Sequence, residues 1–549
     1  MDFVHELIAS AAARPGLTLA SAATFAVVAQ FAIRLYKQRC FFRGLPGPPH
    51  SWLWGHLQIM GEISSMFPPN SHPQAYFTEI SRKYSLEGIF YLDMWPVAPS
   101  MIVVSDPELL DQVTVVKPLP QHQMSEDFLA PITGRNVIAA TNGPVWKKLH
   151  NAMLPAFSWS HIRSVTGVVV DECMLFREAL DKLAASGEAF SMEEMGAKLI
   201  FDVIARIVFN TSLHAQTTGS AYLDDLRELI RLAEGQSDIT LAFNPIARVK
   251  SWWKMRQVNG RLNTSIKGKI QERLHLLRTS GIVPSRKDPT SILDLMLRER
   301  VQDGQDGTAK ENTPLAAIDE PILLSNIKGL LLGGHGTTND SLCFIYMLLS
   351  KSPETITKLR KEHEALFNDN FDRTVENLLS APENLQNLPF TESVIKESLR
   401  LFPVGFGVRG AATGTTLNFR GQTLPIDNNL ALALNGHDTH YNPEYFPEPT
   451  RFRPERWLEP QHEIPRSYFR TFGRGPRACL GQNLAMNELK VILIMTIRDY
   501  DFECVDLRPN SKPRVTYTDL DTVFGDMVFQ ELGLEAKPRG NVCMTVKKR

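Results

Sequence analysis

The chain has 549 residues, of which 43% are hydrophobic, so it is long enough to bury a large core. Its formal net charge of -1 excludes a bulk electrostatic attraction to nucleic acid as the basis of its function. Its cysteines form no Cys-x-x-Cys pair and no dense framework of the secreted kind, which indicates that the main domain works in a reducing compartment. The six cysteines are Cys40, Cys173, Cys343, Cys479, Cys504 and Cys543.

The first forty or so residues differ from the rest of the chain. Residues 17–33 are almost all apolar or small, which is close to the shortest length that can cross a bilayer. A cleavable signal peptide and a buried soluble helix are the alternatives, but the basic residues that follow favour a retained anchor, with the remaining chain on the cytoplasmic side. These basic residues are Arg34, Lys37, Arg39 and Arg43.

A proline-rich segment follows this basic flank. The sequence Leu-Pro-Gly-Pro-Pro at residues 45–49 cannot continue a helix, so it predicts a stiff spacer. The sequence therefore predicts three parts, which are an N-terminal anchor with its basic flank at residues 1–43, a hinge at 44–50 and the main domain at 51–549.

Short strands and then long helices are expected after the hinge. The apolar runs at 89–92 and 101–104 are typical of a strand pair, and Asp106 followed by Pro107 predicts a helix start. A polar stretch at 302–313 predicts a mobile connection, and residues 527–548 alternate as hairpin strands do. Apolar residues at helical spacing predict helices at 165–184, 192–209, 224–233 and 482–498. The expected fold is mostly α with a minor β region.

The strongest chemical signal is the segment 472–481, Phe-Gly-Arg-Gly-Pro-Arg-Ala-Cys-Leu-Gly. A thiolate that binds iron needs shielding from water and backbone N–H donors, and Gly475 and Gly481 let the backbone wrap closely around the Cys479 sulfur. A helix that starts near residue 480 would point its positive end at the thiolate. An ordinary buried cysteine in a glycine-rich turn is the alternative, but here five spaced positions match at once.

The pattern Phe-x-x-Gly-x-Arg-x-Cys-x-Gly, from Phe472 to Gly481, resembles the haem-binding signature of the cytochromes P450. The resemblance implies the cytochrome P450 fold, haem b (iron protoporphyrin IX) as cofactor and Cys479 as its iron ligand, with Arg477 pairing with a haem propionate. Two further motifs appear in the family's order, Glu-Ser-Leu-Arg at 397–400 and Phe-Arg-Pro-Glu-Arg-Trp at 452–457. By that likeness Glu397, Arg400 and Arg456 form a buried charge network on the proximal side of the haem.

Two more positions resemble the family's propionate ligands. The sequence Trp-Lys-Lys-Leu-His at 146–150 resembles the element Trp-x-x-x-Arg, with His150 in place of the commoner arginine. Trp146 and His150 are one helical turn apart, so both can reach the same cofactor edge, and a packed histidine is the alternative for His150. Arg409, shortly after Pro403, is a further propionate candidate.

The sequence Gly-Gly-His-Gly-Thr-Thr at 333–338 resembles the family's oxygen-binding stretch, Ala-Gly-x-Asp/Glu-Thr-Thr. Thr337 matches the threonine that helps deliver protons for cleavage of the O–O bond. Gly336 stands where relatives have an acid, so the usual route of protons is absent from this place. Asp340 lies four residues on, on the same helical face as Gly336, and is a candidate to substitute through water.

The resemblance implies a monooxygenase that inserts one atom of O2 into an apolar small molecule. No Gly-x-Gly-x-x-Gly segment follows a strand, so electrons would come from a separate NADPH-cytochrome P450 reductase, with cytochrome b5 as a further candidate donor. The anchor then implies an endoplasmic reticulum membrane protein with a cytoplasmic domain, and the overall texture resembles fungal microsomal members of polyketide-type secondary metabolism. The alternatives are desaturation, phenol coupling or peroxide rearrangement, and a haem carrier or sensor without turnover.

Two surfaces follow from this resemblance. Basic residues near the cysteine loop are candidates for attracting an acidic reductase surface, with a solvated basic face as the alternative. These are Arg466, Arg470, Arg474 and Lys490. The substrate pocket would have an apolar and aromatic lining, as expected of a buried small-molecule site. The predicted lining residues are Phe128, Leu129, Phe243, Trp252 and Phe406.

Overall fold

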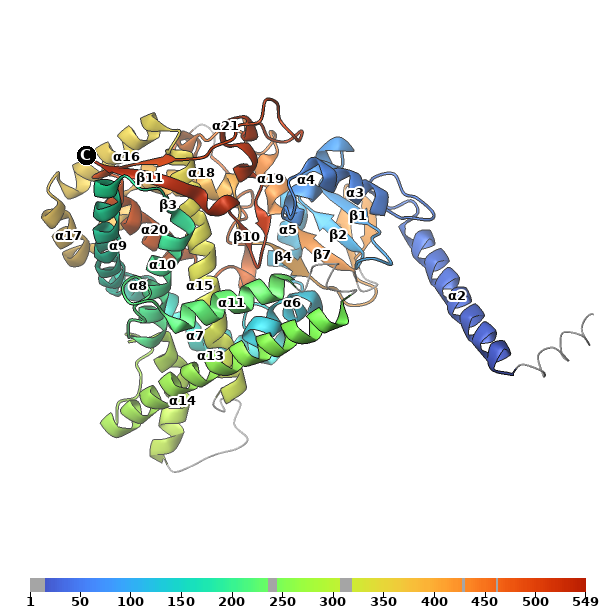
Figure 1. Cartoon of the computed structure of the whole chain (residues 1–549), viewed down its shortest axis with the longest axis horizontal. Helices are drawn as coiled ribbons and strands as arrows, with labels where there is room; N and C mark the ends of the chain where they lie inside the picture. The colour runs from blue at the N-terminus through green and yellow to red at the C-terminus, as the bar shows by residue number, and fades with distance from the viewer. Residues whose placement is uncertain (1–14, 236–243, 307–317, 427–429, 461–462) are drawn as a thin grey trace, which may run out of the picture.

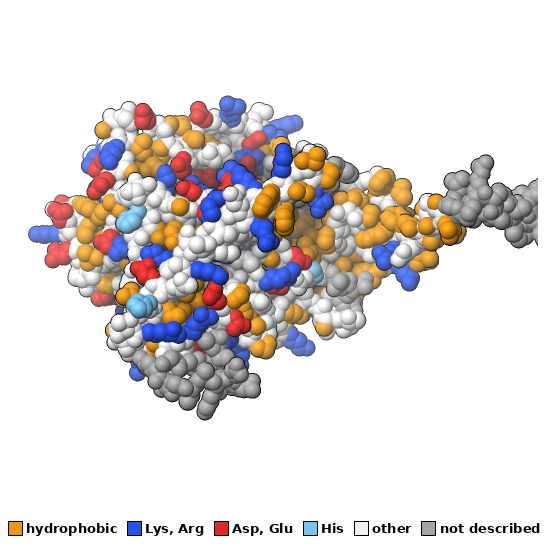
Figure 2. All heavy atoms as spheres, turned by 60° about the horizontal axis from the view of Figure 1, so that its bottom comes forward, with side chains coloured by type: hydrophobic (Ala, Val, Ile, Leu, Met, Phe, Trp, Pro, Cys, Tyr) orange, Lys and Arg blue, Asp and Glu red, His pale blue; other side chains and the backbone are white. Residues whose placement is uncertain are grey.

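The structure is a computed structural model, and it describes residues 15–235, 244–306, 318–426, 430–460 and 463–549. A first helix, α2 (Pro15–Phe42), extends away from the body of the molecule, where Figure 2 shows it as a mostly hydrophobic projection. Its stretch Leu19–Phe42 is 24 residues long and apolar enough to cross a membrane, and its most apolar part is not buried against the body.

The end of α2 is joined to the body by a buried ion pair. Arg39 pairs with Asp93, both side chains are fully buried, and Arg39 also donates to the carbonyls of Trp52, Leu53 and Trp95. Gln38 adds a hydrogen bond of 3.0 Å to Asp93. Burial alone would raise the pKa of Asp93, but hydrogen bonds from its neighbours and the charge of Arg39 hold it below its ordinary value. Arg39 is therefore part of the domain and not a free charge of the basic flank.

A four-stranded sheet lies where α2 meets the body (Figure 1), with the order β1 (Ile89–Leu92), β2 (Met101–Val104), β7 (Ala431–Leu434) and β4 (Gly407–Arg409). Strands β1 and β2 are antiparallel, with Ile89 opposite Val104, and coincide with the predicted strand pair. The Asp106 side chain accepts hydrogen bonds from the first turn of the next helix, as predicted. A separate pair consists of β5 (Thr416–Phe419) and β6 (Gln422–Pro425).

Helices make up most of the body, which confirms the predicted fold class. The long helix α15 (Glu320–Leu349) runs through the centre and packs along α10 (Met192–Phe209). Gly196 permits this close approach, because a Cβ there would overlap the side chain of Asn339. The predicted helices are α9 (Thr166–Ser186), α10, α11 (Ala221–Gly235) and α20 (Gln482–Thr496).

The remaining helices surround this core. They are α3 (Leu57–Met66), α4 (Pro73–Lys83), α5 (Pro107–Asp111), α6 (Gln123–Thr133), α7 (Gly143–Met153), α8 (Trp159–Ser164), α13 (Pro245–Ser280), α14 (Ile292–Asp306), α16 (Pro353–Phe367), α17 (Phe371–Ser380), α18 (Pro389–Leu401), α19 (Gly436–Tyr441) and α21 (Asp521–Phe524). Short π- or 3-10 turns are η1 (Gln112–Val116), η2 (Leu154–Phe157), η3 (Pro382–Asn387), η4 (Pro454–Trp457), η6 (Gly475–Arg477), η7 (Gly525–Val528) and η8 (Gly540–Val542). Of the predicted connection at 302–313, residues 302–306 belong to α14 and 307–313 lie outside the described residues.

The C-terminal strands pair differently from a simple hairpin. Strand β11 (Cys543–Lys548) lies between β8 (Tyr500–Cys504) and β3 (Phe190–Ser191). The hairpin itself is short and consists of β9 (Glu531–Leu532) and β10 (Ala536–Lys537). Its turn carries residues 533–535 into the interior, toward α15.

Candidate active site

A cavity of about 500 Å³ lies between α15 and the loop that precedes α20. The loop contributes Cys479 to one wall, and α15 contributes Gly333 and Thr337 to the opposite wall. Trp146 and Arg409 lie along its edge. Segments that are far apart in sequence therefore meet around one space, as the predicted site residues require.

Cys479 is presented to the cavity by backbone hydrogen bonds. Its own N–H donates to the carbonyl of Phe472 at 2.8 Å, which closes the loop. Burial raises the pKa of the Cys479 thiol, and the N–H groups of Gly481 and Gln482 oppose this because they stabilise the thiolate. Helix α20 starts at Gln482, so the positive end of its dipole also faces the sulfur. Burial still outweighs these donors and keeps the pKa raised, so the N–H groups and the helix end would stabilise a thiolate once a metal cation binds the sulfur.

The two glycines of the loop have different neighbours. Gly475 has φ +79°, and a Cβ there would overlap the carbonyl oxygen of Thr114, so this glycine lets the loop pack against η1 rather than against the sulfur. Gly481 has an ordinary backbone conformation, and a Cβ there would lie 3.8 Å from the Cys479 sulfur. Only Gly481 is adjacent to the thiolate.

Two arginines and two aromatic rings form one edge of the cavity. The Arg477 guanidinium lies over the Trp146 ring, 4.1 Å from its centroid, and the rings of Trp146 and His150 are 4.9 Å apart. Arg477 also donates to the Thr141 carbonyl at 2.8 Å. The structure thus brings together Trp146, His150, Arg409 and Arg477, which the sequence placed at the propionates.

The charge of this edge is not balanced by protein carboxylates. Arg409 is only 6% exposed, and burial together with the charge of Arg477 lowers its pKa to about 10. Gln121 accepts a hydrogen bond from Arg409, but among the described residues neither Arg409 nor Arg477 has an acidic partner. Buried cations without partners are costly, so this edge is suited to an anionic cofactor such as haem, with its two propionates.

Sequence reasoning missed the side chains that orient these arginines. Gln121 accepts from Arg409, and Asn142 accepts from Arg477 at 2.9 Å and also donates to the Gln121 carbonyl at 3.0 Å. The sequence offered one signal for Asn142, because it directly precedes α7 and asparagine is a preferred residue at the N-cap of a helix. Gln121 carries no comparable sequence signal.

Helix α15 forms the wall opposite Cys479. The Thr337 hydroxyl faces the cavity and donates to the Gly333 carbonyl at 2.7 Å, while nothing lies within 4 Å of a Cβ placed on Gly333. Gly334 has a packing role, because a Cβ there would lie 2.6 Å from the Ile204 side chain of α10. Asp340 is buried behind the helix and does not line the cavity.

The predicted charge network lies on α18 and η4, and its members are in contact. Arg400 makes two hydrogen bonds to Glu397, at 3.0 and 2.9 Å, and Arg456 makes one at 3.0 Å. Trp457 donates a further bond of 3.0 Å to the same carboxylate. Burial raises the pKa of Glu397, but the two arginines outweigh burial and hold it below its ordinary value. The three predicted residues thus form one buried cluster.

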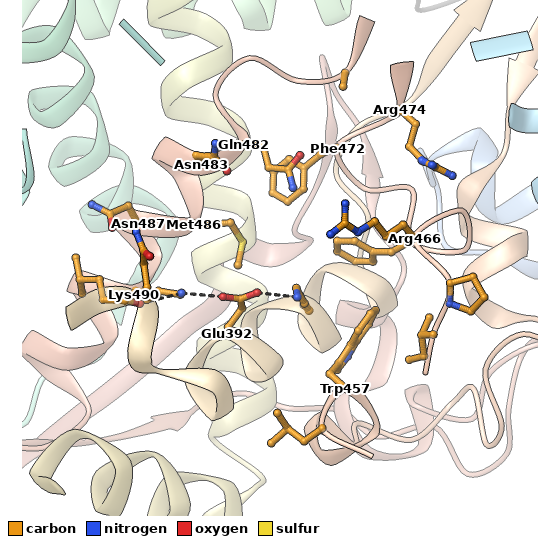
Figure 3. A pocket seen from close by; sticks show the side chains of 18 of the residues that line it. Glu392, Trp457, Arg466, Phe472, Arg474, Gln482, Asn483, Met486, Asn487 and Lys490 are labelled. Carbon is orange, nitrogen blue, oxygen red and sulfur yellow. Dashed lines mark hydrogen bonds and ion pairs between the residues drawn. The ribbon is translucent and has the colours of Figure 1, made fainter. Parts of the chain in front are cut away.

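A second cavity, of about 920 Å³, opens on the other side of the cysteine loop and is lined by Arg466, Arg474 and Lys490 (Figure 3). Lys490 is buried in an ion pair of 2.9 Å with Glu392, and Arg470 is likewise buried against Asp111. Both charges are buried and paired, which favours a structural role for these two cations over attraction of a reductase. Arg466 stays a candidate, and so does Arg474, which pairs with the same Asp111 at 2.7 Å but is 29% exposed.

The predicted substrate lining is largely wrong. Of the five aromatic and aliphatic residues predicted to line the substrate pocket, only Phe406 lines the cavity of about 500 Å³. Leu129 packs into the core, and Phe243 lies outside the described residues. Phe128 and Trp252 are 45% and 58% exposed. The cavity is lined instead by aliphatic side chains from several elements, namely Ile138 before α7, Ile204 of α10, Leu330 of α15, Val404 after Pro403 and Leu484 of α20.

The geometry defines a class of protein. A buried cysteine with backbone N–H donors beside its sulfur, two cavity-edge arginines without an acidic partner among the described residues and a threonine on the opposite wall fit a haem oxidoreductase with a cysteine iron ligand. When bound, haem supplies the redox chemistry of oxygen, which these side chains alone do not provide.

Comparisons with known proteins identify the family. The profile of the cytochrome P450 family matches residues 45–518, so the chain belongs to the cytochrome P450 family. Cytochrome P450 monooxygenase polC of Polytolypa hystricis is 30% identical over 491 residues, which cover 86% of this chain and 85% of that protein. Cytochrome P450 monooxygenase acrF of Aspergillus aculeatus is 29% identical over 508 residues, covering 88% and 99%.

The fold agrees with this assignment. The crystal structure of the cytochrome P450DA heme domain matches with a TM-score of 0.70 at 18% identity, over 92% of this chain and 97% of that one. The predicted family, the haem cofactor and the assignment as a monooxygenase are thus confirmed. The individual roles of the site residues stay predictions, supported by the contacts described above.

Proposed function

We propose that this monooxygenase oxidises an apolar small molecule of fungal secondary metabolism, of the polyketide type, while anchored in the endoplasmic reticulum membrane. The observation that carries the proposal is the cavity itself, in which Cys479 and Thr337 face each other across a largely aliphatic lining. Beside Thr337 on α15, aliphatic residues such as Ile204 and Leu330 line the cavity, which favours hydroxylation or epoxidation of a substrate that is held mainly by apolar contacts. The Polytolypa and Aspergillus relatives support the fungal assignment.

The residues of this chain have separate tasks in the proposed reaction. Arg409 and Arg477 would hold the anionic edge of the cofactor, and the N–H groups of Gly481 and Gln482 would stabilise the Cys479 sulfur as a thiolate when it binds the iron. Thr337 holds a hydroxyl at the wall where protons are needed, with its oxygen fixed by the Gly333 carbonyl. The apolar walls exclude bulk water from the substrate.

The electrons would come from an NADPH-cytochrome P450 reductase, with cytochrome b5 as an alternative donor. The cavity of about 920 Å³ borders the cysteine loop, and its lining includes Arg163, Arg466 and Arg474, of which the last two are labelled in Figure 3. Such cations favour an acidic partner surface and would speed association at low ionic strength.

Two apolar surfaces support attachment to a membrane. The exposed helix α2 has the length of a single span, and the basic residues that follow favour a cytoplasmic domain. The first turns of α13 expose a further group of large apolar side chains, on the side of the body from which α2 extends (Figure 1). These are Ile246, Val249, Trp252 and Trp253, between 58% and 69% exposed. Tryptophans of this kind favour the membrane interface.

The test begins with the full chain in detergent. Reduced protein exposed to carbon monoxide should show the long-wavelength Soret band of thiolate ligation, and Cys479→Ala should abolish it, whereas Cys504→Ala should not. A spectrum typical of histidine ligation in the wild type would disprove the assignment of Cys479.

The second stage addresses the substrate. A panel of apolar polyketide-type metabolites is screened for substrate-induced shifts of the Soret band, and compounds that bind are then incubated with reductase, NADPH and 18O2. One labelled oxygen atom in the product supports the proposal. A product formed without incorporated oxygen would show desaturation, coupling or rearrangement instead.

A further inference from the structure

The side-chain position of Gly336 is filled by a carboxylate from the other end of the chain. A Cβ placed on Gly336 would overlap Oε1 of Glu535 and lie 3.1 Å from its Cδ. Position 336 is where the family pattern has an acid. An acid is therefore present beside this turn of α15, but the C-terminal hairpin supplies it.

The hairpin holds Glu535 in a fixed place. Glu535 directly precedes β10, and its carbonyl accepts from the Gly533 N–H at 3.1 Å. The Ala536 N–H donates to the Val404 carbonyl at 3.0 Å, and the buried Gln530 side chain donates to the Ala536 carbonyl at 2.7 Å. The backbone on either side of Glu535 is thus bonded, so the carboxylate is positioned before any substrate binds.

Asp340 completes a pair of acids behind α15. It lies one helical turn after Gly336, is 4% exposed, and its Oδ2 has no hydrogen-bond partner among the described residues. Burial raises the pKa of Asp340 well above its ordinary value, and the charge of Glu535 is the next largest cause. A buried carboxyl without a partner is costly, which indicates that this one exchanges a proton or binds water.

Charged groups from three other elements connect the pair to the surface. Glu193 of α10, Glu234 of α11 and Lys537 of β10 all act on the two acids. Lys537 and Glu234 form an ion pair of 3.5 Å, with side chains 31% and 26% exposed. Burial and the charge of Glu234 raise the pKa of Glu535 to about 7, where an acid can both give and regain a proton at neutral pH.

We propose that Glu535, together with Asp340, is the proton relay of this enzyme and replaces the acid that α15 lacks at Gly336. The proposal deepens the proposed function and rests on it. Thr337 follows Gly336 directly and lines the cavity, so the absent side chain at 336 lets Glu535 approach the helix backbone next to the threonine. The route runs from the Glu234–Lys537 pair to Glu535, which shares its proton with Asp340, and from Glu535 past Gly336 to the Thr337 hydroxyl.

The relay supplies the protons that the reaction consumes. Substrate R–H, O2, two electrons and two protons give R–OH and H2O, and the reductase delivers the electrons from NADPH. The carboxyl O–H of Glu535 breaks as its proton moves toward Thr337, and solvent at Glu234 and Lys537 returns a proton to the carboxylate. Reduction of O2 to H2O2 without substrate needs two protons as well, so a slower relay also slows that reaction.

The first test measures NADPH-driven oxygen consumption by the haem-loaded full chain with reductase and no substrate. Glu535→Gln, which keeps the shape of the side chain, should lower the rate on the order of tenfold and increase the solvent isotope effect. Glu503→Gln, an exposed carboxylate on β8, is the matched control and should leave both unchanged. Unchanged rate and isotope effect in Glu535→Gln, alongside an active wild type, would overturn the relay.

A transfer of the acid separates a relay from a structural role. Gly336→Glu alone places a side chain on top of Glu535, whereas Gly336→Glu combined with Glu535→Ala returns the carboxylate from the helix side. The double variant should recover the rate and the wild-type isotope effect that Glu535→Ala loses. A double variant that folds and binds haem but recovers neither would also overturn the relay.

The second readout needs no turnover. Infrared titration of the resting protein should show a protonated carboxyl C=O band that titrates near pH 7 and is missing in Glu535→Gln, which would be direct evidence of the proton held by Glu535. Retention of the band in Glu535→Gln would contradict the assignment. Failure of the proposed function is distinct, since it would appear as a wild type that consumes no oxygen with NADPH and reductase.

Discussion

The guanidinium of Arg477 stacks on the indole of Trp146, with its central carbon 4.1 Å from the ring centroid. The contact joins the cysteine loop to α7, so two parts of the haem edge are fixed by one interaction. Hydrogen bonds to Thr141 and Asn142, both just before α7, hold the same guanidinium. A charged group held on three sides loses little further freedom when it binds an anion.

Arg477→Lys should therefore weaken haem binding although it keeps the charge. A lysine loses the planar stacking and the forked hydrogen bonds, a cost of about 1 kcal/mol or about fivefold in the haem dissociation constant. Arg477→Ala should lose more, because the positive charge is also removed. The haem content of purified protein and the rate of haem transfer to apomyoglobin measure this, with Arg466→Lys as the control. Equal haem retention in all four proteins would contradict the propionate role of Arg477.

The sequence predicted those parts of the site that lie in local motifs. Cys479, Arg477 and Trp146 each stand in a short pattern whose spacing decides which side chains share a face, so the structure brings them to one cavity. The strand pair at 89–92 and 101–104 and the helix at 192–209 were likewise set by local periodicity. These features depend on neighbours in sequence, which is why they could be predicted.

Features that depend on distant contacts could not be predicted. Arg39 was read as a flank charge because its partner, Asp93, lies 54 residues later. Glu535 appeared only as one residue of an alternating segment, since its contact with Gly336 joins the C-terminal hairpin to the central helix. The aromatic residues expected in the pocket were wrong for the same reason, because composition does not tell which face of α6 or α13 points inward.

The stability of the protein without its anchor should depend on the residue at which the deletion ends. A deletion of residues 1–43 removes Arg39 and leaves the buried Asp93 with His50, at 3.0 Å, as its remaining ion-pair neighbour, so we expect a loss of up to about 3 to 5 kcal/mol in the free energy of unfolding. A deletion of residues 1–33 keeps Gln38 and Arg39. Urea unfolding of the two proteins should show the difference, while both should be released from membranes more readily than the full chain.

A second variant identifies the cause of that difference. Asp93→Asn in the shorter protein, which lacks residues 1–43, removes the buried charge that has lost its arginine partner and should restore part of the lost stability. In the deletion of residues 1–33 the same substitution should destabilise, because it breaks an intact pair. Equal stability of the two truncations would show that the Arg39–Asp93 pair contributes little.

The stability of the protein should carry a pH dependence that comes from Glu535. Its pKa is raised from 4.5 to about 7 by burial and the charge of Glu234, so between these values the folded protein holds a proton that the unfolded chain has released. This contribution to stability is complete below about pH 4.5 and is lost as the pH rises through about 7. Asp340, Glu193 and Glu234 add to the effect, and Lys537 opposes it.

Glu535→Gln should remove that dependence. The midpoint temperature of thermal unfolding of the variant minus that of the wild type should therefore increase as the pH is raised from about 5 to about 8. Over this range only the wild type must ionise the Glu535 carboxyl in the folded state. Glu503→Gln should follow the wild type across the whole range. A constant difference between Glu535→Gln and the wild type would show that the carboxyl has an ordinary pKa in the folded protein.

Thr337 and Asp340 should give different kinetic signatures because they lie on different faces of α15. The Thr337 hydroxyl lines the cavity, so under the proposed role Thr337→Ala removes a proton donor from that wall, and peroxide released per NADPH should rise several-fold with substrate present. Thr337→Ser keeps a hydroxyl and should retain coupling. Asp340 lies behind the helix, so Asp340→Asn should slow NADPH consumption with a smaller change in peroxide yield.

Turnover assays with reductase and a substrate that shifts the Soret band, quenched at fixed times, measure the rate of NADPH oxidation and the ratio of peroxide to product. The two variants should differ in these quantities. Loss of the relay in Asp340→Asn slows proton supply both to product and to peroxide, whereas loss of the hydroxyl in Thr337→Ala changes the ratio of peroxide to product. If Thr337→Ala turns over the substrate with unchanged rate and coupling, Thr337 has no part in oxygen activation. Oxidation without oxygen insertion would then become the better account of this cavity.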